Sequence, residues 1–205
     1  MPRVLTVFLG VAVVLLLIVG PVAFAVHDRE HNLRNFRVVR DGVLYRSGQP
    51  SEQALKRLVH DYGIRTVISL RDARGPGLPM PEPWEEEFCE REEVTFVRLP
   101  PRHWEGVDDK NPPPVDENVQ KFLEIMNDPH NHPVLIHCFG GVHRTGAYSA
   151  IYRMEFEGWT NQQAMDEMFA CGYTTLYVEW DILGYMERYR PGQRLQITFH
   201  PDLPR

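Results

Sequence analysis

The sequence predicts an α/β domain with a central, mostly parallel sheet flanked by helices, preceded by an N-terminal apolar helix. Two patterns support this prediction. Short apolar runs typical of buried strands alternate with longer segments whose apolar residues recur at helical spacing, and this alternation is typical of parallel sheets covered by helices. At the N-terminus, residues 4–26 contain no charged side chain. This segment is therefore predicted to form the apolar helix.

The first half of the domain begins with a hairpin signal. Asp41-Gly42 lies between two runs rich in apolar residues, as in many tight hairpins. Ser51 is a typical helix N-cap, and Gly63 is a typical helix stop. The elements expected here are strands at 36–39 and 43–46, a helix from Ser51 to about Tyr62 and a strand over 64–70.

The second half contains two irregular stretches, at 75–83 and 100–114, that are rich in Gly or Pro. Further along, Thr160 and Gln163 match a capping box, which marks the start of a helix. The remaining predicted elements are a helix over 84–92, a strand over 94–99, a helix over 115–127, a strand over 133–136, and helices over 144–156, 160–170 and 177–189.

The bulk composition is that of an ordinary globular protein. Of 205 residues, 43% are hydrophobic and 24% are charged, which suffices for one sizeable domain. A net charge of −6 argues against nucleic-acid binding, which normally needs a basic surface. Cys89, Cys138 and Cys171 are too widely spaced for a disulfide framework or a metal site. We therefore expect no nucleic-acid partner, no metal and no other cofactor, and the sequence indicates no oligomeric state.

The charge-free segment 4–26 has two interpretations. As a helix it would be roughly 35 Å long, enough to cross a hydrocarbon core of about 30 Å, and this favours a single-pass membrane anchor. The alternative is a cleaved signal peptide with Ala23-Phe24-Ala25 as its cleavage site, after which the protein would be exported.

The charges beside this segment predict its orientation. Four arginines follow it closely, whereas only Arg3 and the α-amine precede it. The positive-inside rule then places the C-terminal part in the cytoplasm, where a thiol stays reduced. We divide the chain into an anchor or signal peptide at 1–26, a polar linker at 27–34, a globular domain at 35–190 and a tail at 191–205.

The stretch from His137 to Gly146 has the most specific chemistry. It links the predicted strand at 133–136 to the helix that begins at Arg144. Backbone N–H groups of such a loop can converge on one centre, and the helix N-terminus adds partial positive charge. The same field favours the thiolate of Cys138, which can act as a nucleophile. Arg144 offers a planar fork of donors that matches two oxygens of a phosphate group.

These residues carry a family resemblance. Cys138, five further residues and Arg144-Thr145-Gly146 resemble the signature of the cysteine-dependent protein-tyrosine and dual-specificity phosphatases. Three longer stretches are similar to the plant and fungal atypical dual-specificity phosphatases and their bacterial relatives, namely LYRSGQP at 44–50, VISLR at 67–71 and NHPVLIHC at 131–138. The resemblance covers roughly residues 35–190. It implies a cysteine-phosphatase fold, a phosphatase domain with these bounds and hydrolysis of phosphomonoesters through a phosphocysteine intermediate.

The resemblance also implies roles for the residues of the motif. Cys138 is the expected nucleophile, and Thr145 is expected to donate its hydroxyl to the cysteine sulfur. His137 is expected either to orient the loop by hydrogen bonding or to fill a structural position. The side chain of His143 faces either the substrate or solvent. The expected phosphate-binding residues are Phe139, Gly140, Gly141, Val142, His143 and Arg144.

A general acid must protonate the leaving oxygen. In the family this group is an aspartate on a mobile loop upstream of the cysteine. Asp108 and Asp109 fit that description, with Asp108 preferred, unless both are merely solvated charges. His103 is a third candidate, because the residues after the strand at 94–99 depart from the family pattern. Arg46 and Arg71 also match family positions, and we expect them to bond loop carbonyls or carboxylates.

The loop side chains bear on the substrate. Family members that act on inositol pyrophosphates carry basic residues at three loop positions, which here are Phe139, Gly140 and Val142. The predicted helix at 84–92 is acidic, so a polyanionic substrate would gain little from the local field. We therefore expect a phosphoprotein or a singly phosphorylated small molecule as substrate of a protein-tyrosine/dual-specificity phosphatase.

Two alternatives stay open. One is a phosphoinositide or inositol (pyro)phosphate phosphatase, which requires that Arg102, Lys110 or Lys121 reach the site. The other is a non-catalytic phosphate-binding module that keeps the loop but lacks a working acid.

Overall fold

The computed structural model describes residues 17, 19–21, 33–73, 75, 77–106 and 111–192. Within them, a five-stranded sheet has the order β1-β2-β5-β3-β4. Its strands are β1 (Arg37–Arg40), β2 (Leu44–Ser47), β3 (Thr66–Ser69), β4 (Thr95–Arg98) and β5 (Val134–His137). β1 and β2 are antiparallel, and every other neighbouring pair is parallel. The predicted mostly parallel sheet is confirmed.

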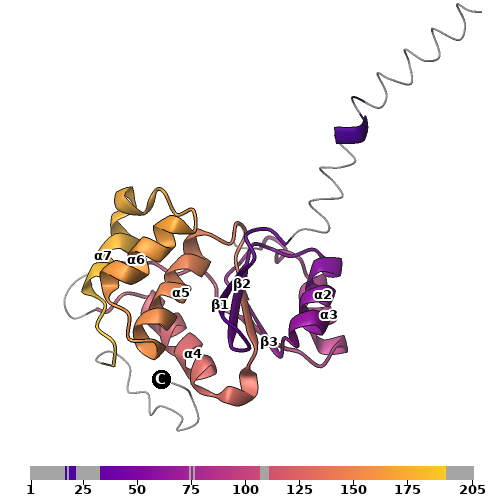
Figure 1. The fold of residues 1–205 in the computed structure, drawn as a ribbon, viewed down its shortest axis with the longest axis horizontal. Helices are drawn as coiled ribbons and strands as arrows, with labels where there is room; N and C mark the ends of the chain where they lie inside the picture. Colours follow the sequence, from indigo (N-terminus) through magenta and orange to yellow (C-terminus); the bar gives the residue numbers. More distant parts are fainter. Residues whose placement is uncertain are drawn as a thin grey trace, which may run out of the picture.

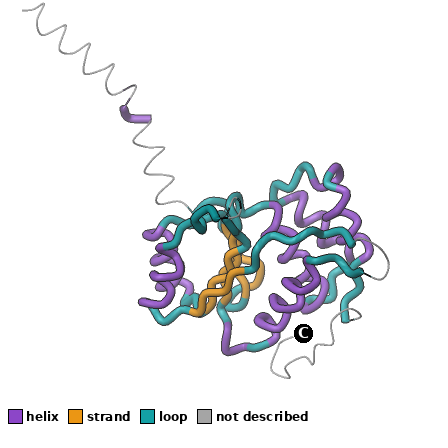
Figure 2. Tube along the Cα trace, turned by 180° about the vertical axis from the view of Figure 1, so that it is seen from behind, coloured by secondary structure: helices purple, strands orange, loops and turns teal. Residues whose placement is uncertain are grey.

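Helices cover both faces of this sheet, as predicted (Figure 1). One layer contains α2 (Glu52–Tyr62) and α3 (Trp84–Arg91). The other contains α4 (Val115–Asn127), α5 (His143–Phe156), α6 (Asn161–Ala170) and α7 (Trp180–Arg188). Two short 3₁₀ turns, η1 (Pro129–Asn131) and η2 (Leu176–Val178), complete the described elements. Figure 2 shows the sheet between these two helical layers from the opposite side.

The central strand β5 is apolar on both faces, which explains its place in the middle of the sheet. Leu135 packs into the apolar cluster under α2 and α3, whereas Val134 and Ile136 pack into the larger cluster under α4 to α7. At the carboxyl end of β5, His137 pairs with Ser47 of β2 on one side and Ser69 of β3 on the other. The chain leaves the sheet at this point, which is the usual position of a functional site in an α/β fold.

Most local signals in the sequence correspond to the observed elements. The Ser51 side chain caps α2, and Gly63 ends that helix with a φ of 63°. The predicted helix at 177–189 is instead divided into η2 and α7. The reason is Glu179, which accepts hydrogen bonds from Tyr173 and Thr175 and adopts non-helical backbone angles of −99° and 78°.

The prediction of a single-pass membrane anchor requires correction. Most of the segment 4–26 lies outside the described residues, and only Leu17 and residues 19–21 of it are described, as exposed helical positions. Within the ranges that the structure describes, no helix is both long and apolar enough to cross a bilayer, a task that needs about 20 residues. The predicted membrane location is therefore contradicted, and the predicted membrane partner is not supported.

Candidate active site

Cys138 is the first residue after β5, and the rigid strand fixes its position. The residue is only 4% exposed. Its Sγ accepts a hydrogen bond from the backbone N–H of Gly141 at 3.2 Å, and the Thr145 Oγ1 lies 3.9 Å from the same sulfur. A backbone N–H and a hydroxyl group therefore lie beside the sulfur.

The loop after Cys138 packs directly against the end of β2. Gly141 has a φ of 73°, and a Cβ added there would lie 2.3 Å from the backbone nitrogen of Gly48. No side chain can occupy that space without moving the backbone. Glycine at position 141 therefore allows the loop backbone to approach the end of β2 closely before the chain enters α5.

The side chain of Arg46, in β2, stabilises this loop through hydrogen bonds. Its side chain is buried, and its Nη2 donates to the carbonyls of Gly141 at 2.9 Å and Val142 at 3.1 Å. A trans peptide directs its N–H away from its carbonyl, so these bonds turn the N–H groups of Val142 and His143 to the opposite side. Burial lowers the pKa of Arg46, whereas negative charge on Cys171, Glu167 and Cys138 acts in the other direction. The expected bonding to loop carbonyls is confirmed.

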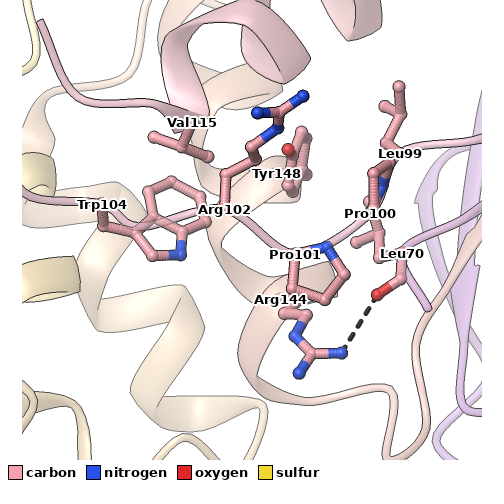
Figure 3. Close-up of a pocket in the computed structure, with 9 residues that line it drawn as sticks. All are labelled: Leu70, Leu99, Pro100, Pro101, Arg102, Trp104, Val115, Arg144 and Tyr148. Atoms are coloured by element: carbon pink, nitrogen blue, oxygen red, sulfur yellow. Dashed lines mark hydrogen bonds between the residues drawn. The ribbon is translucent and has the colours of Figure 1, made fainter. Parts of the chain in front are cut away.

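Arg144 lies in the first turn of α5, on the opposite side of the loop from Arg46. It is half-buried, and its Nη1 donates to the carbonyl of Leu70 at 3.1 Å (Figure 3). Its guanidinium lines a pocket of about 40 Å³ that is covered by the segment after β4. In Figure 3, Arg102 and Trp104 extend from that segment above Arg144. The guanidinium is therefore held at one nitrogen beside a small pocket.

The two aspartates predicted as general acids, Asp108 and Asp109, lie outside the described residues, as does Lys110. The described ends of their segment are close together, because a Cβ at Gly106 would lie 2.6 Å from the carbonyl oxygen of Asn111. Trp104 fixes the near end by packing edge-on against Tyr148 and Tyr185. The third candidate, His103, is exposed, and its backbone carbonyl accepts from the N–H of Val115.

The His137 side chain makes a contact that sequence reasoning missed. Its Nε2 lies 2.9 Å from Oε1 of Glu85 on α3, and both side chains are almost completely buried. Neither ring nitrogen of His137 has a hydrogen-bond partner among the described residues, so this is a close contact rather than an aligned hydrogen bond. One signal could have revealed Glu85, because it shares a helical face with the apolar residues Phe88 and Cys89.

A second network surrounds Phe139, the first loop residue, whose side chain is 54% exposed. The Arg34 and Arg71 guanidinium carbons lie 5.0 and 5.5 Å from the centre of its ring. Arg71 also pairs with Glu82 and donates to Gln49 at 2.6 Å, so its expected bonding to a carboxylate is confirmed. Phe139 lines a pocket of about 450 Å³, and Trp84 is also among its lining residues.

The sequence did not predict whether His143 faces the substrate or solvent. The residue is exposed, and its ring stacks on that of Tyr173, with ring centres 4.3 Å apart. The Tyr173 hydroxyl donates to Glu179 at 2.6 Å. Burial acts to raise the pKa of Glu179, but hydrogen bonds from Thr175 and Tyr173 together with the nearby His143 lower it overall. The carboxylate therefore helps to fix the ring on which His143 rests.

Of the three basic residues named for a polyanionic substrate, Arg102 and Lys121 are described. Arg102 lines the Arg144 pocket but is paired with Glu117 at 3.5 Å. Lys121 is exposed on α4. Of the three, the structure brings only Arg102 to the candidate site, and Lys110 is not described.

Comparison with known proteins agrees with this geometry. The family described as DSP-PTPase phosphatase fused to NAD+ kinase matches residues 22–177. Inositol diphosphatase DSP3 of Arabidopsis thaliana is 32% identical over 133 residues, which are 65% of this chain and 60% of the relative. The dual specificity protein phosphatase TpbA of Pseudomonas aeruginosa (strain UCBPP-PA14) is 30% identical over 132 residues, 64% of this chain and 52% of the relative. The chain thus spans about half to three fifths of these relatives.

Among solved structures, P. aeruginosa TpbA in complex with pTyr matches with a TM-score of 0.57 and 26% identity. The match covers 76% of this chain and 84% of that one. The two chains therefore share the sheet and helices that surround the Cys138 loop.

Proposed function

Because this chain belongs to the DSP-PTPase phosphatase family, we propose that it hydrolyses phosphomonoesters through a phosphocysteine intermediate, as a protein-tyrosine/dual-specificity phosphatase. The resemblance predicted from the sequence is confirmed by the family match. The observation that carries the proposal is the position of the Cys138 sulfur, buried at the end of β5 with the N–H of Gly141 at 3.2 Å. We assign the activity to a domain at 35–190, with a linker at 27–34 and a tail at 191–205.

The proposed reaction has two steps. The Cys138 thiolate attacks phosphorus, the ester P–O bond breaks, and the leaving oxygen takes a proton from the general acid. Water then attacks the phosphocysteine and gives a proton to the same residue. The S–P bond breaks, which releases phosphate and restores the thiolate. In each step the three equatorial oxygens of the transferred phosphoryl group carry negative charge and face the loop.

The N–H groups of residues 139–144 and the Arg144 fork would bind those oxygens, and this electrostatic contribution is usually the largest in such a site. To do so, Arg144 exchanges or extends its bond to the Leu70 carbonyl. The Thr145 hydroxyl, near the sulfur, would stabilise the thiolate. Arg46 serves the same reaction indirectly, since it directs loop N–H groups toward the phosphate.

For the general acid we propose Asp108 ahead of Asp109, with His103 as the third candidate. The support is the anchoring of their segment. Trp104, in the described part of this segment, lines the same pocket as Arg144. Asp108→Asn and Asp109→Asn should differ in kcat, and if neither lowers kcat the assignment fails.

The surroundings of the loop support a substrate of low charge. Phe139 replaces a basic side chain, and the cation Arg71 beside it is already paired with Glu82. The neighbouring pocket has aromatic walls from Phe139 and Trp84 and could accept an apolar residue next to a phosphotyrosine. The related TpbA has been crystallised with pTyr, which supports the same substrate class.

A second candidate function is hydrolysis of an inositol pyrophosphate. It is favoured by the name of the Arabidopsis relative, an inositol diphosphatase, and by the position of Arg34 over Phe139. One experiment separates the candidates. The full chain and its Cys138→Ser variant are given para-nitrophenyl phosphate, and then phosphotyrosine peptides compete against inositol pyrophosphates. Absence of Cys138-dependent hydrolysis from pH 5 to 8 would refute both enzyme functions.

A further inference from the structure

The loop after Cys138 contains a peptide unit between two glycines, Gly140 and Gly141. Gly141 has a φ of 73°, and a Cβ added at Gly140 would contact nothing within 4 Å. The N–H of this peptide belongs to Gly141 and donates to the Cys138 sulfur at 3.2 Å. Rotation of the peptide about its two flanking bonds would turn the carbonyl toward the sulfur instead. Because glycine permits most backbone angles, the two residues restrict this rotation little, and a contact from outside the loop is needed to fix it.

A side chain from the segment before β1 contacts the other end of this peptide. Asn35 Nδ2 donates to the carbonyl of Gly140 at 2.7 Å. A carbonyl oxygen can only accept, so the amide nitrogen of Asn35 faces it rather than the amide oxygen. In a trans peptide the C=O and the N–H point in opposite directions. The bond that holds the Gly140 carbonyl on the outside therefore directs the Gly141 N–H inward, to the sulfur.

Asn35 is itself fixed by the turn in which it lies. The N–H of Phe36 donates to the carbonyl of Leu33 at 3.0 Å, which closes a β-turn, and Asn35 adopts a φ of 50° within it. Asparagine is one of the residues other than glycine that adopt this left-handed angle most readily. The turn is attached to the end of β2, because the N–H of Gly48 donates to the carbonyl of Arg34 at 2.7 Å. The Asn35 side chain thus extends from a backbone that is anchored beside the loop.

The carbonyls before and after that of Gly140 have donors of their own. The backbone N–H of Gln49 donates to the carbonyl of Phe139 at 3.2 Å, and Arg46 donates to the two carbonyls that follow Gly140. Asn35 completes this series, so four successive carbonyls are held on the outer side of the loop. The N–H groups of the same four peptides then face the centre at which a phosphate would bind.

We propose that Asn35 is a positioning residue of the active site, which holds the Gly140–Gly141 peptide so that the Gly141 N–H faces the Cys138 sulfur. Asn35 acts through this peptide rather than on the substrate. The geometry of the loop therefore depends on a side chain 105 positions before Gly140 in the chain. The inference rests on the proposed role of Cys138 as nucleophile, because the oriented N–H serves the sulfur and the oxygens beside it.

Asn35→Gly removes the amide donor and keeps the backbone of the turn, since glycine adopts a φ of 50° without strain. NMR measurement of amide hydrogen exchange in the full chain reports on the Gly141 N–H directly. We expect this amide to exchange about fivefold faster in the variant, as for the loss of one hydrogen bond. The amides of Val142 and His143, whose peptides Arg46 holds, should keep their wild-type rates. Unchanged exchange at Gly141, or an equal increase at all three amides, would overturn the proposal.

A second variant separates the donor from the shape of the side chain. Asn35→Asp keeps the size of residue 35 and its tolerance for the left-handed angle, but a carboxylate cannot donate at pH 7. Exchange at Gly141 should rise in this variant as it does in Asn35→Gly. If Asn35→Asp instead keeps the wild-type exchange rate, the shape of the side chain rather than its amide holds the loop, and the proposal is wrong.

Activity is measured with the same proteins. For para-nitrophenyl phosphate, kcat/KM should fall about fivefold in Asn35→Gly. The matched control Asn161→Asp loses bonds from its amide to the carbonyls of Met186 and Tyr189, and it should keep both kcat/KM and the Gly141 exchange rate. Unchanged kcat/KM in Asn35→Gly, or an equal fall in the control, would contradict the positioning role.

The exchange measurement needs no turnover. If the wild type does not hydrolyse para-nitrophenyl phosphate, the proposed phosphatase function fails, whereas the exchange rates of Gly141 still decide whether Asn35 orients the loop. A failure of the proposed function is therefore distinguishable from a failure of this inference.

Discussion

Two buried cysteines lie on opposite sides of the sheet end, and only one of them has the surroundings of a nucleophile. Cys89 is completely buried in α3, and Cys138 is 4% exposed. Burial raises the pKa of Cys89 to about 12, and the nearby Glu85 and Glu86 act in the same direction. Cys138 instead receives a backbone N–H and lies near the guanidinium of Arg46. Donors and positive charge, rather than exposure, therefore distinguish the two thiols.

The largest expected difference between the two cysteines is in catalysis. Cys138→Ser should lower kcat by at least about 10⁴-fold, because serine is a far weaker nucleophile than a thiolate in this loop. Cys89→Ser should keep kcat within about twofold of the wild-type value and should change mainly the free energy of unfolding. Initial rates with para-nitrophenyl phosphate check both values. Equal losses in the two variants would mean that Cys138 has no special role.

Arg144→Lys should cause the second largest loss of catalytic activity. Lysine keeps the charge but cannot offer two parallel donors to a phosphate, so kcat/KM should fall about 10²- to 10³-fold. Thermal unfolding should change little, since Arg144 contributes only one described bond, to the carbonyl of Leu70. Arg153→Lys on the same helix is a matched control away from the loop. If the variant keeps the kcat/KM of wild type, Arg144 does not bind the phosphate group.

The two thiols should also differ in reactivity in the native protein. At pH 7, iodoacetamide should modify Cys138 at least about a hundredfold faster than Cys89, because the thiolate is the reactive form and the raised pKa of Cys89 leaves almost none of it. Peptide mass spectrometry after short reaction times gives both rates, and addition of vanadate should protect Cys138 alone. Comparable rates would contradict the contrast drawn between the two sites.

Arg46→Met tests the support of the loop rather than its chemistry. Methionine fills much of the volume but leaves the Gly141 carbonyl without its buried donor. We expect a loss of about 2–3 kcal/mol in the free energy of unfolding, measured by urea denaturation. The exposed variant Arg57→Met serves as control. Unchanged stability together with unchanged kcat would show that the loop holds its shape without Arg46.

The smallest expected effect concerns substrate preference. Phe139→Lys places a cation at the loop position where inositol pyrophosphate phosphatases carry a basic residue. KM for an inositol pyrophosphate should fall about tenfold at low salt, whereas KM for a phosphotyrosine peptide should stay the same or rise. Phe169→Lys, on an exposed position of α6, controls for added charge. An equal fall for both substrates would show that position 139 does not select between them.

The parts of the site that the sequence could predict are those fixed by neighbours along the chain. The strand, loop and helix around Cys138 form one continuous segment. The alternation of strands and helices indicated the sheet, and the family resemblance of the stretch 44–50 indicated the contacts of Arg46. Glu85 was missed because its partner, His137, is distant in sequence, and a run of glutamates suggests a solvated helix face. The division of the last helix was missed for a different reason. The hydroxyl groups of Tyr173 and Thr175, which are close in sequence, bind Glu179 and compete with helical geometry there.

The central claim is that Cys138 forms a covalent bond to phosphorus during turnover. Acid quenching of the full chain during hydrolysis of para-nitrophenyl phosphate, followed by peptide mass spectrometry, tests it directly. We predict the mass of one phosphoryl group on the peptide that contains Cys138, formed in wild type and in Cys89→Ser but absent in Cys138→Ser. Turnover with phosphate on another residue, or with no phosphorylated peptide at any quench time, would contradict the account.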